Sequence, residues 1–377
     1  MTSLNLTNGS LILASLVSLF FSSCTYSLQG PFFPGVATAK GLSAFQYSIV
    51  FSSFELVSFI ASFPIVKLMN ILGYKLVTVL SAVLLGLSVI LFGWFYYVDD
   101  STGFFLSCLF GRTLEALGNT GLTTGVMTIA TDHFPHIATL IIASTEMSYG
   151  LGFVFGPLIS GPIYDAWGYV AAFVLVGFVI LAFAVLLVCV LPRDNEANIK
   201  NDFESKAAIG IIDILKVRRL WFGLPVLASS EVSLTMVLTF LEPHLRNFKF
   251  STSEISLIFS VTGLAFATGT VFWGLLCYKY CEPHHAMTTG SILHILGFSF
   301  IGPLPFLRTR LTIWKVMIGI FLTGCGMGAQ AMPSFFFIKK VRQTFPLFNF
   351  ANRAIKELAA LCTAHLSDHK IYPSWLW

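Results

Sequence analysis

The sequence predicts an all-α membrane protein that crosses the bilayer many times. The chain has 377 residues, of which 56% are hydrophobic and 11% charged, whereas a soluble domain carries about 25% charged residues. Its mean hydropathy is +0.82. Apolar runs of about 20 residues, long enough to cross a bilayer as helices, follow one another along most of the chain. A soluble globular protein is therefore excluded, and lipid is expected to cover most of the surface.

The apolar runs form a group of six followed by a group of four. The first group covers about 11–30, 46–68, 74–97, 103–130, 137–164 and 168–191, and the second about 220–241, 253–278, 286–307 and 311–338. Short turns rich in Gly, Pro and Asp join the first six runs, and a polar stretch with charges of both signs separates the groups. We therefore predict an N-terminal six-helix half at 1–191, a central loop at 192–219, a partial C-terminal half of about four helices at 220–338 and a divergent tail at 339–377.

Lysine and arginine residues outside the runs predict the orientation in the membrane. Cytoplasmic loops of membrane proteins carry an excess of these residues. With a cytoplasmic N-terminus, the basic central loop and tail lie inside, whereas Asp99 and Asp100 lie outside. We therefore predict a cytoplasmic N-terminus. The expected location is an intracellular vesicle membrane or the plasma membrane, between which the charge pattern does not choose. The net charge is only +4 and no basic cluster alternates with aromatic residues, so no nucleic-acid partner is expected.

Ionisable side chains near the middle of the predicted spans are the main candidate functional residues, because a charge there costs roughly 2.5–3.5 kcal/mol on insertion scales. They are Glu55, Arg112, Glu115, Glu146 and Glu231. Arg112 and Glu115 are three residues apart and can pair on one helical face. The other three acids then lack a cation partner in the spans. A buried, unpaired carboxyl group holds a proton, so these acids either exchange a proton for a cation or hydrogen-bond in neutral form between helices.

The fifth run contains closely spaced glycine and proline residues, namely Gly152, Gly156, Pro157, Gly161 and Pro162. Gly152 and Gly156 are about one helical turn apart, and small residues let a neighbouring backbone approach closely. Each proline removes a hydrogen bond within the helix, so the helix is expected to bend where the glycines pack. This combination predicts a helix-packing or gating element.

Four other segments add to this pattern. They are 111–118 around Arg112 and Glu115, the stretch 28–34 with Gln29, Pro31 and Pro34 just after Tyr26, the stretch 240–245 with Glu242, and the short loop with Asn70, Gly73 and Lys75. Through these motifs and the glycine-proline pattern, the sequence resembles the major facilitator superfamily. Within it the chain is most similar to the vesicular amine transporter family, nearest the polyamine-transporting branch. The loop motif departs from the family pattern, since Asn70 stands where an acid is usual.

The resemblance implies twelve helices in two six-helix halves, with a substrate site between the halves and alternating access by rocking. Because only ten runs are present, we expect a C-terminally truncated form that lacks helices eleven and twelve. The family's monoamine members carry an acid in the first helix, which this run lacks, and a Lys in the second, where this chain has Glu55. An acidic lining suits a substrate with several amines.

These features predict a secondary active transporter that exchanges protons for an organic cation, an amine or polyamine. The candidate coupling residues are Glu55, Arg112, Glu115, Glu146, Glu231 and Glu242. The alternative is a non-transporting truncated membrane protein that binds or modulates a full-length homologue. No catalytic motif argues for an enzyme. No cofactor is expected, and no metal either, because the cysteines and histidines of 277–285 lack a standard zinc spacing. The expected partners are the lipid bilayer, the cation and protons.

Overall fold

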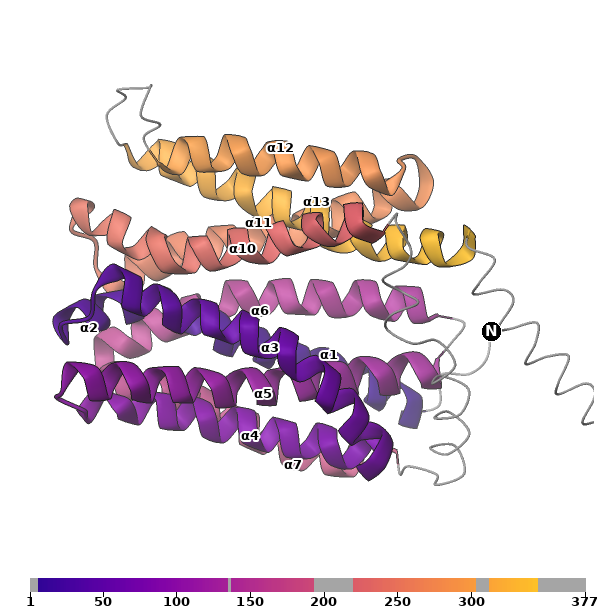
Figure 1. Cartoon of the computed structure of the whole chain (residues 1–377), viewed down its shortest axis with the longest axis horizontal. Coiled ribbons are helices and arrows are strands. Elements are labelled where there is room, and N and C mark those ends of the chain that lie inside the picture. The colour runs from indigo at the N-terminus through magenta and orange to yellow at the C-terminus, as the bar shows by residue number, and fades with distance from the viewer. Residues whose placement is uncertain (1–5, 135–136, 193–219, 303–311, 345–377) are drawn as a thin grey trace, which may run out of the picture.

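The computed structural model describes residues 6–134, 137–192, 220–302 and 312–344, and in these ranges it consists of helices and short connections without strands (Figure 1). The longer helices are α1 (Leu6–Leu28), α2 (Phe33–Ala39), α3 (Ala44–Leu72), α4 (Tyr74–Trp94), α5 (Ser101–His133), α6 (Ala138–Trp167), α7 (Tyr169–Val190), α10 (Leu220–Leu245), α11 (Thr252–Lys279), α12 (Pro283–Ile301) and α13 (Ile313–Thr344). Two short 3-10 helices follow α4 and α10, at Phe95–Tyr97 and Arg246–Phe248. The predicted all-α class is confirmed.

Each of the ten predicted runs is occupied by one long helix, whose ends differ from the predicted ones by up to six residues. The short helix α2 was not predicted, because the first apolar run was expected to end at about residue 30. Proline is favourable in the first helical turn, and Pro34 occupies that place in α2. Helix α13 continues to Thr344, six residues beyond the predicted end at 338. The rest of the predicted tail and residues 193–219 of the predicted central loop lie outside the described residues.

The helices form two packed groups, α1–α7 and α10–α13, which Figure 1 shows as two layers of roughly parallel helices. In the first group, α4 packs against α5 and α7, and α1 packs against α6. In the second, α13 packs against α11 and α12. Helix α6 packs along α11 and makes the most extensive contact between the two groups. We call the groups the N-terminal half and the C-terminal half.

Seven helical segments among the described residues are long and apolar enough to cross a membrane, judged by length and composition. Helices α5, α6 and α12 are not in that set, although the sequence predicted spans there. Polar residues explain the difference for α5, since Arg112, Glu115 and Asn119 lie on it and are buried in protein. Helices enclosed by other helices tolerate such residues, whereas outward-facing side chains such as Phe59, Trp94 and Phe178 are exposed and apolar. This distribution suits a bundle surrounded by lipid.

Among the described residues, a capping box begins one helix in each half. Ser43 and Gln46 form a capping box at the start of α3, and Ser251 and Glu254 form one at the start of α11. Both caps lie at the end of the bundle that also carries α2, which we call the α2 end. The caps fix where these two helices begin, and so fix which of their residues reach the middle of the bundle.

Candidate functional site

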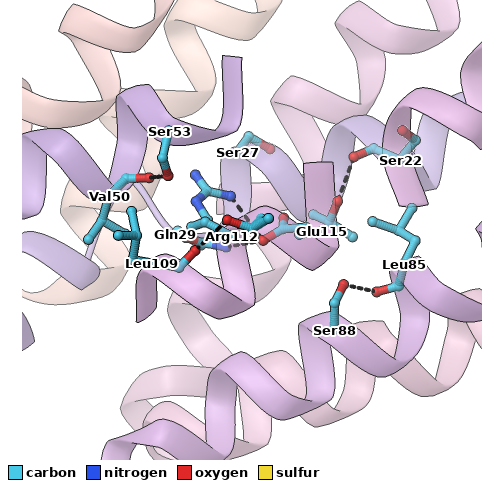
Figure 2. Close-up of polar contacts among 12 residues, drawn as sticks. Ser22, Ser27, Gln29, Val50, Ser53, Leu85, Ser88, Leu109, Arg112 and Glu115 are labelled. Atoms are coloured by element: carbon cyan, nitrogen blue, oxygen red, sulfur yellow. Dashed lines mark hydrogen bonds and ion pairs between the residues drawn. The ribbon is translucent and has the colours of Figure 1, made fainter. Parts of the chain in front are cut away.

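A fully buried ion pair lies in the middle of the N-terminal half. On α5, Arg112 Nη1 lies 3.0 Å from Glu115 Oε2, and neither side chain is exposed. Gln29, at the end of α1, donates from Nε2 to the same carboxylate oxygen at 3.0 Å (Figure 2). Two donors from two helices therefore hold one carboxylate, as expected where a charge must be compensated away from water.

Three aromatic rings surround the Arg112 guanidinium group. Its central carbon lies 5.6 Å from the ring centre of Tyr26, 5.4 Å from that of Phe51 and 5.1 Å from that of Phe54. These distances permit cation–π attraction. Arg112 Nε and Nη2, Glu115 Oε1 and Gln29 Oε1 are buried and have no hydrogen-bond partner among the described residues. The cluster therefore keeps polar atoms that the surrounding protein does not satisfy.

A second set of acids lies where the two halves meet. Glu146 on α6 and Glu231 on α10 line one cavity of about 40 Å³, together with residues of both halves that include Tyr149, Phe153, Thr262 and Phe266. Glu231 interacts electrostatically with both Glu146 and Glu55 of α3. None of the three acids forms an ion pair within the described ranges. Carboxyl groups from both halves therefore lie within electrostatic reach of one another without forming an ion pair, and Arg112 of the neighbouring cluster acts on Glu55.

The cavity volume sets what this conformation can hold. About 40 Å³ exceeds the roughly 10–15 Å³ that a water molecule requires. Pockets for small organic ligands measure about 300–1,000 Å³. This conformation therefore has room for water beside Glu146 and Glu231, and the cavity is smaller than the pockets that usually hold organic ligands.

Tyr26 connects the buried ion pair with the acids between the halves. Its ring packs against Phe54 at 4.8 Å and lies beside Arg112, and its hydroxyl lies 3.3 Å from Thr235 Oγ1 on α10. Tyr26 also interacts with the Glu55 carboxyl group. One residue of the predicted first-helix set therefore contacts both halves at the same level as the acids.

Glu242 lies apart from the other predicted coupling residues, at the α2 end. Arg246 donates to it from Nε at 2.8 Å and from Nη2 at 2.9 Å. Nη2 of Arg246 also lies 3.4 Å from Thr38 Oγ1 on α2, in the other half. The hydrogen bonds that Arg246 donates to the Glu242 carboxylate raise the pKa of Arg246 above its usual value, so the guanidinium stays charged. The pair forms a polar contact between the halves.

Other contacts also join the halves at the α2 end. Ser253 at the start of α11 donates from its backbone to Asp165 near the end of α6 at 3.0 Å. Gly30 lies against Leu238 and Phe259, so closely that a Cβ atom there would meet each side chain at 2.8 Å. Since Leu238 and Phe259 are both buried, the halves are packed together at this end.

We expect the Arg246→Ala variant to loosen the α2 end, because it removes the bidentate ion pair and the contact with Thr38. The readout is the rate at which a membrane-impermeant thiol reagent labels Leu238→Cys, in a chain whose native cysteines are replaced. Labelling should rise severalfold. Lys249→Gln, which removes an exposed charge just beyond the same short helix, serves as the control and should leave the rate unchanged. Equal labelling in parent and Arg246→Ala would contradict a role of this pair in holding the halves together at the α2 end.

The glycines of α6 allow close contact with two helices. Ser23 Oγ of α1 donates to Tyr149 O at 2.6 Å, and Ser27 Oγ lies 3.3 Å from Gly152 O. Side chains at Gly152 and Gly156 would collide with α1, whereas one at Gly161 would meet Ser256 of α11. The glycine-proline pattern therefore packs α6 against α1 within one half and against α11 across the halves.

Gly156→Val should lower the free energy of unfolding by about 1–3 kcal/mol, the usual cost of overpacking. A Cβ atom there would meet Cys24 O at 2.8 Å, and backbone cannot move aside as a flexible side chain can. Heating in detergent, followed by the loss of monodisperse protein, measures the change. Gly9→Val is the matched control, since no atom lies within 4 Å of a Cβ at that helical glycine. Equal loss in both variants would show that close packing at Gly156 is not the cause.

The predicted loop residues lie at the junction of two helices, with Asn70 near the end of α3, Lys75 at the start of α4 and only Gly73 between the helices. Asn70 Oδ1 accepts from Tyr74 at 2.8 Å, and Lys75 Nζ donates to Leu191 O at the end of α7 at 2.7 Å. Gly73 joins α3 to α4 with φ of 94°, a conformation that favours glycine. These residues therefore fix the ends of α3, α4 and α7.

Pro31 and Pro34 are buried where α1 ends and α2 begins. The break lets Gln29 reach Glu115 while Thr38 on α2 reaches Arg246. The last of the sequence features is the group of cysteines and histidines at 277–285. Neither there nor elsewhere among the described residues do three or more His, Cys, Asp or Glu side chains come together as metal ligands would.

Several residues that complete the site were not predicted from the sequence. Tyr149 and Thr262 line the cavity, and Thr235 contacts Tyr26. Ser22 of α1, which Figure 2 labels, hydrogen-bonds the Asn119 side chain of α5. Such neutral residues are common in membrane helices, so only their position facing another helix reveals them.

Comparisons with known proteins agree with this architecture. The family model described as Major Facilitator Superfamily matches residues 15–342. A rat (Rattus norvegicus) protein named MFS-type transporter SLC18B1 is 26% identical over 82% of this chain and 67% of its own length. The human (Homo sapiens) protein of the same name is 27% identical over 86% of this chain and 70% of its own.

Solved structures with this fold are more distant in sequence. A bacterial homolog to the human lysosomal transporter Spinster, in an inward-facing and unoccupied conformation, matches with a TM-score of 0.64 and 17% identity, over 89% of this chain and 79% of that one. A D-xylose-proton symporter matches with a TM-score of 0.63 and 15% identity, over 85% and 80%. At these identities the likeness supports the fold alone.

Proposed function

This chain belongs to the Major Facilitator Superfamily and is a multi-pass membrane transporter rather than an enzyme, and from that premise we propose that it exchanges protons for an organic cation. The observation that carries the proposal is that Glu55, Glu146 and Glu231 lie within electrostatic reach of one another where the halves meet and form no ion pair among the described residues. An organic cation would supply the missing positive charge. Protons would supply it when the cation leaves.

Both halves contribute acids to this site, which supports coupling between the binding of a cation or protons and the movement of the halves. Glu55 and Glu146 belong to the N-terminal half, and Glu231 belongs to the C-terminal half. Mutual repulsion of three ionised carboxylates favours separation of the halves, whereas a bound cation or bound protons remove that repulsion. Loading and unloading the site therefore changes the balance between conformations that expose it to opposite sides.

A multiply charged amine fits this site better than an anion. The cavity is lined by acids and by aromatic rings such as Tyr149 and Phe153, which attract ammonium groups. The motif resemblance to the polyamine-transporting branch points the same way. We therefore propose amines, and polyamines in particular, as the substrate class.

The orientation predicted from the lysine and arginine residues also assigns a side of the membrane to the contacts at the α2 end. With a cytoplasmic N-terminus, the α2 end faces the vesicle lumen or the cell exterior, and contacts there close that side. One pH unit across the membrane supplies about 1.4 kcal/mol per proton, and 100 mV adds about 2.3 kcal/mol per net charge moved. An acidic compartment on the α2 side would therefore drive amine accumulation into it.

The test is uptake of radiolabelled spermidine, and of a labelled monoamine, by vesicles that contain the purified full chain. An imposed pH gradient, acidic inside, should drive spermidine uptake that collapses when the gradient is dissipated. Empty vesicles give the background. Uptake equal to background at every imposed gradient would overturn the proposal and leave the alternative, a membrane protein that binds or modulates a full-length homologue.

A further inference from the structure

A buried hydrogen-bond network inside the C-terminal half holds three helices together at mid-bundle. Its centre is the Gln330 side chain on α13, which is not exposed. Gln330 Nε2 donates to Ser291 Oγ on α12 at 3.0 Å, and Gln330 Oε1 accepts from Ser229 Oγ on α10 at 3.0 Å. Both ends of the amide are therefore engaged, and the Ser229 hydroxyl shares its proton between Gln330 and Val226 O at 2.7 Å on its own helix.

A second polar contact lies one helical turn further along α10. Ser233 Oγ donates to the backbone oxygen of Ser229 at 2.8 Å and lies 3.2 Å from Nδ1 of His294 on α12. Because the Ser233 hydroxyl proton is used in the bond to Ser229 O, Nδ1 of His294 is the donor to Ser233 Oγ. Gly326 of α13 makes room for the His294 ring, because a Cβ atom there would meet the ring at 2.6 Å. The helices are therefore packed closely around this network.

The hydrogen-bond network and Glu231 lie on opposite faces of α10. At 3.6 residues per turn, Ser229 and Ser233 lie on one face of α10, and Glu231 lies about 200° around the axis from Ser229. The serine face contacts α12 and α13. The opposite face presents Glu231 to the cavity that it shares with Glu146 and Tyr149.

We propose that Gln330 is a positioning residue that, through Ser229, fixes the rotation of α10 and so holds the Glu231 carboxyl group in the cavity between the halves. In a membrane there is little hydrophobic driving force to choose one rotation of a helix over another, so interhelical hydrogen bonds and small residues do so. The apolar character of α10 alone does not select this rotation, because Val232 and Met236 are exposed beside Glu231 on the same helix. The role in cation binding rests on the proposed function, whereas the role in orienting α10 does not.

Crosslinking of the cavity tests the orientation without any need for transport. Glu146→Cys and Glu231→Cys are introduced into a full-length chain whose native cysteines are replaced, and a short bifunctional thiol reagent is applied in lipid vesicles. Adding Gln330→Leu should lower the crosslinked fraction severalfold. Ser229→Ala should lower it as well, and Ser229→Thr, which keeps the hydroxyl group, should restore it. Ser299→Ala on α12, whose exposed hydroxyl bonds only its own helix in the described structure, is the control and should have no effect.

Uptake kinetics in the chain with native acids provide the second readout. Gln330→Leu should raise the KM for spermidine about tenfold, which corresponds to about 1.4 kcal/mol, and leave kcat within about twofold. A merely structural defect would reduce the amount of folded protein without changing KM. If Gln330→Leu does not fold, the Ser229→Ala and Ser229→Thr pair decides between the two roles.

Unchanged crosslinking in both Gln330→Leu and Ser229→Ala would overturn the proposal, and so would an equal loss in Ser299→Ala. If the parent chain shows no uptake but crosslinking still depends on Gln330, the proposed function fails and the orienting role stands. If uptake is present and crosslinking is independent of Gln330, the orienting role fails and the proposed function stands.

Discussion

Glu231→Gln should reduce gradient-driven spermidine uptake roughly 10- to 150-fold. The substitution keeps the shape of the side chain but removes one of the three unpaired carboxyl groups that meet at mid-bundle. A hydrogen bond to a charged group contributes about 1.5–3 kcal/mol, which corresponds to that range of affinity. Glu146→Gln, on the opposite wall of the same cavity, should have an effect of similar size. Initial uptake rates across a series of spermidine concentrations and imposed gradients measure both.

A control variant and the dependence on the pH gradient test whether the loss of uptake comes from the acids at this site. Asp99→Asn removes an acid that is exposed at the α2 end and pairs with Lys40 at the surface. Exposed pairs contribute little to stability, so this variant should transport as the parent does. The Glu146→Gln and Glu231→Gln variants should also lose their dependence on the pH gradient, because the exchanged protons would reside on those carboxyl groups. Uptake that keeps both its rate and its gradient dependence in the two Gln variants would refute coupling at this site.

Arg112→Met should destabilise the fold by about 3–5 kcal/mol, the usual cost of breaking a buried ion pair by removing one partner. Glu115 is buried on the same helix, and only the amide of Gln29 would remain to compensate its charge. Met keeps much of the side-chain volume among the aromatic rings of Tyr26, Phe51 and Phe54. The loss is measured as the fall in the midpoint of heat-induced unfolding in detergent and in the yield of monodisperse protein.

A double variant separates the charge effect from packing. Arg112→Met combined with Glu115→Gln removes both charges and keeps a hydrogen-bond acceptor for Gln29. This variant should recover most of the lost stability, because no uncompensated charge remains in the core. If the single variant is as stable as the parent, or if the double variant is no more stable than the single one, an uncompensated Glu115 is not what destabilises the protein.

Most of the helical architecture could be predicted from the sequence because the bilayer imposes a length on each apolar run. The ten predicted runs correspond to the ten long helices among the described residues. The short helix α2 could not be predicted in this way, because seven residues are too few to produce a hydropathy signal. The end of α13 was also placed too early, since basic residues suggested a membrane boundary while the helix itself continues.

The candidate site could be predicted in part. Charged residues inside apolar runs are rare, so Glu55, Arg112, Glu115, Glu146 and Glu231 were evident from the sequence. Their grouping was not, since it separates one buried ion pair from three acids between the halves. Glu242 has the same charge but lies at the α2 end with Arg246. Helix spacing relates residues within one run only, and carries no information about which runs are neighbours.

The chain's own residues determined that it is a membrane-embedded bundle of helices, which side chains bring charge into the bilayer, and where small residues allow close packing, because each of these follows from local composition and spacing. The tertiary structure alone decided that α6 packs against both α1 and α11, that Tyr26 contacts Thr235, and that Gln330 joins α10 to α12. These contacts join residues far apart in the sequence, and each depends on the rotation of a helix about its axis. In lipid that rotation is set by hydrogen bonds and close packing between helices, and neither is visible in hydropathy.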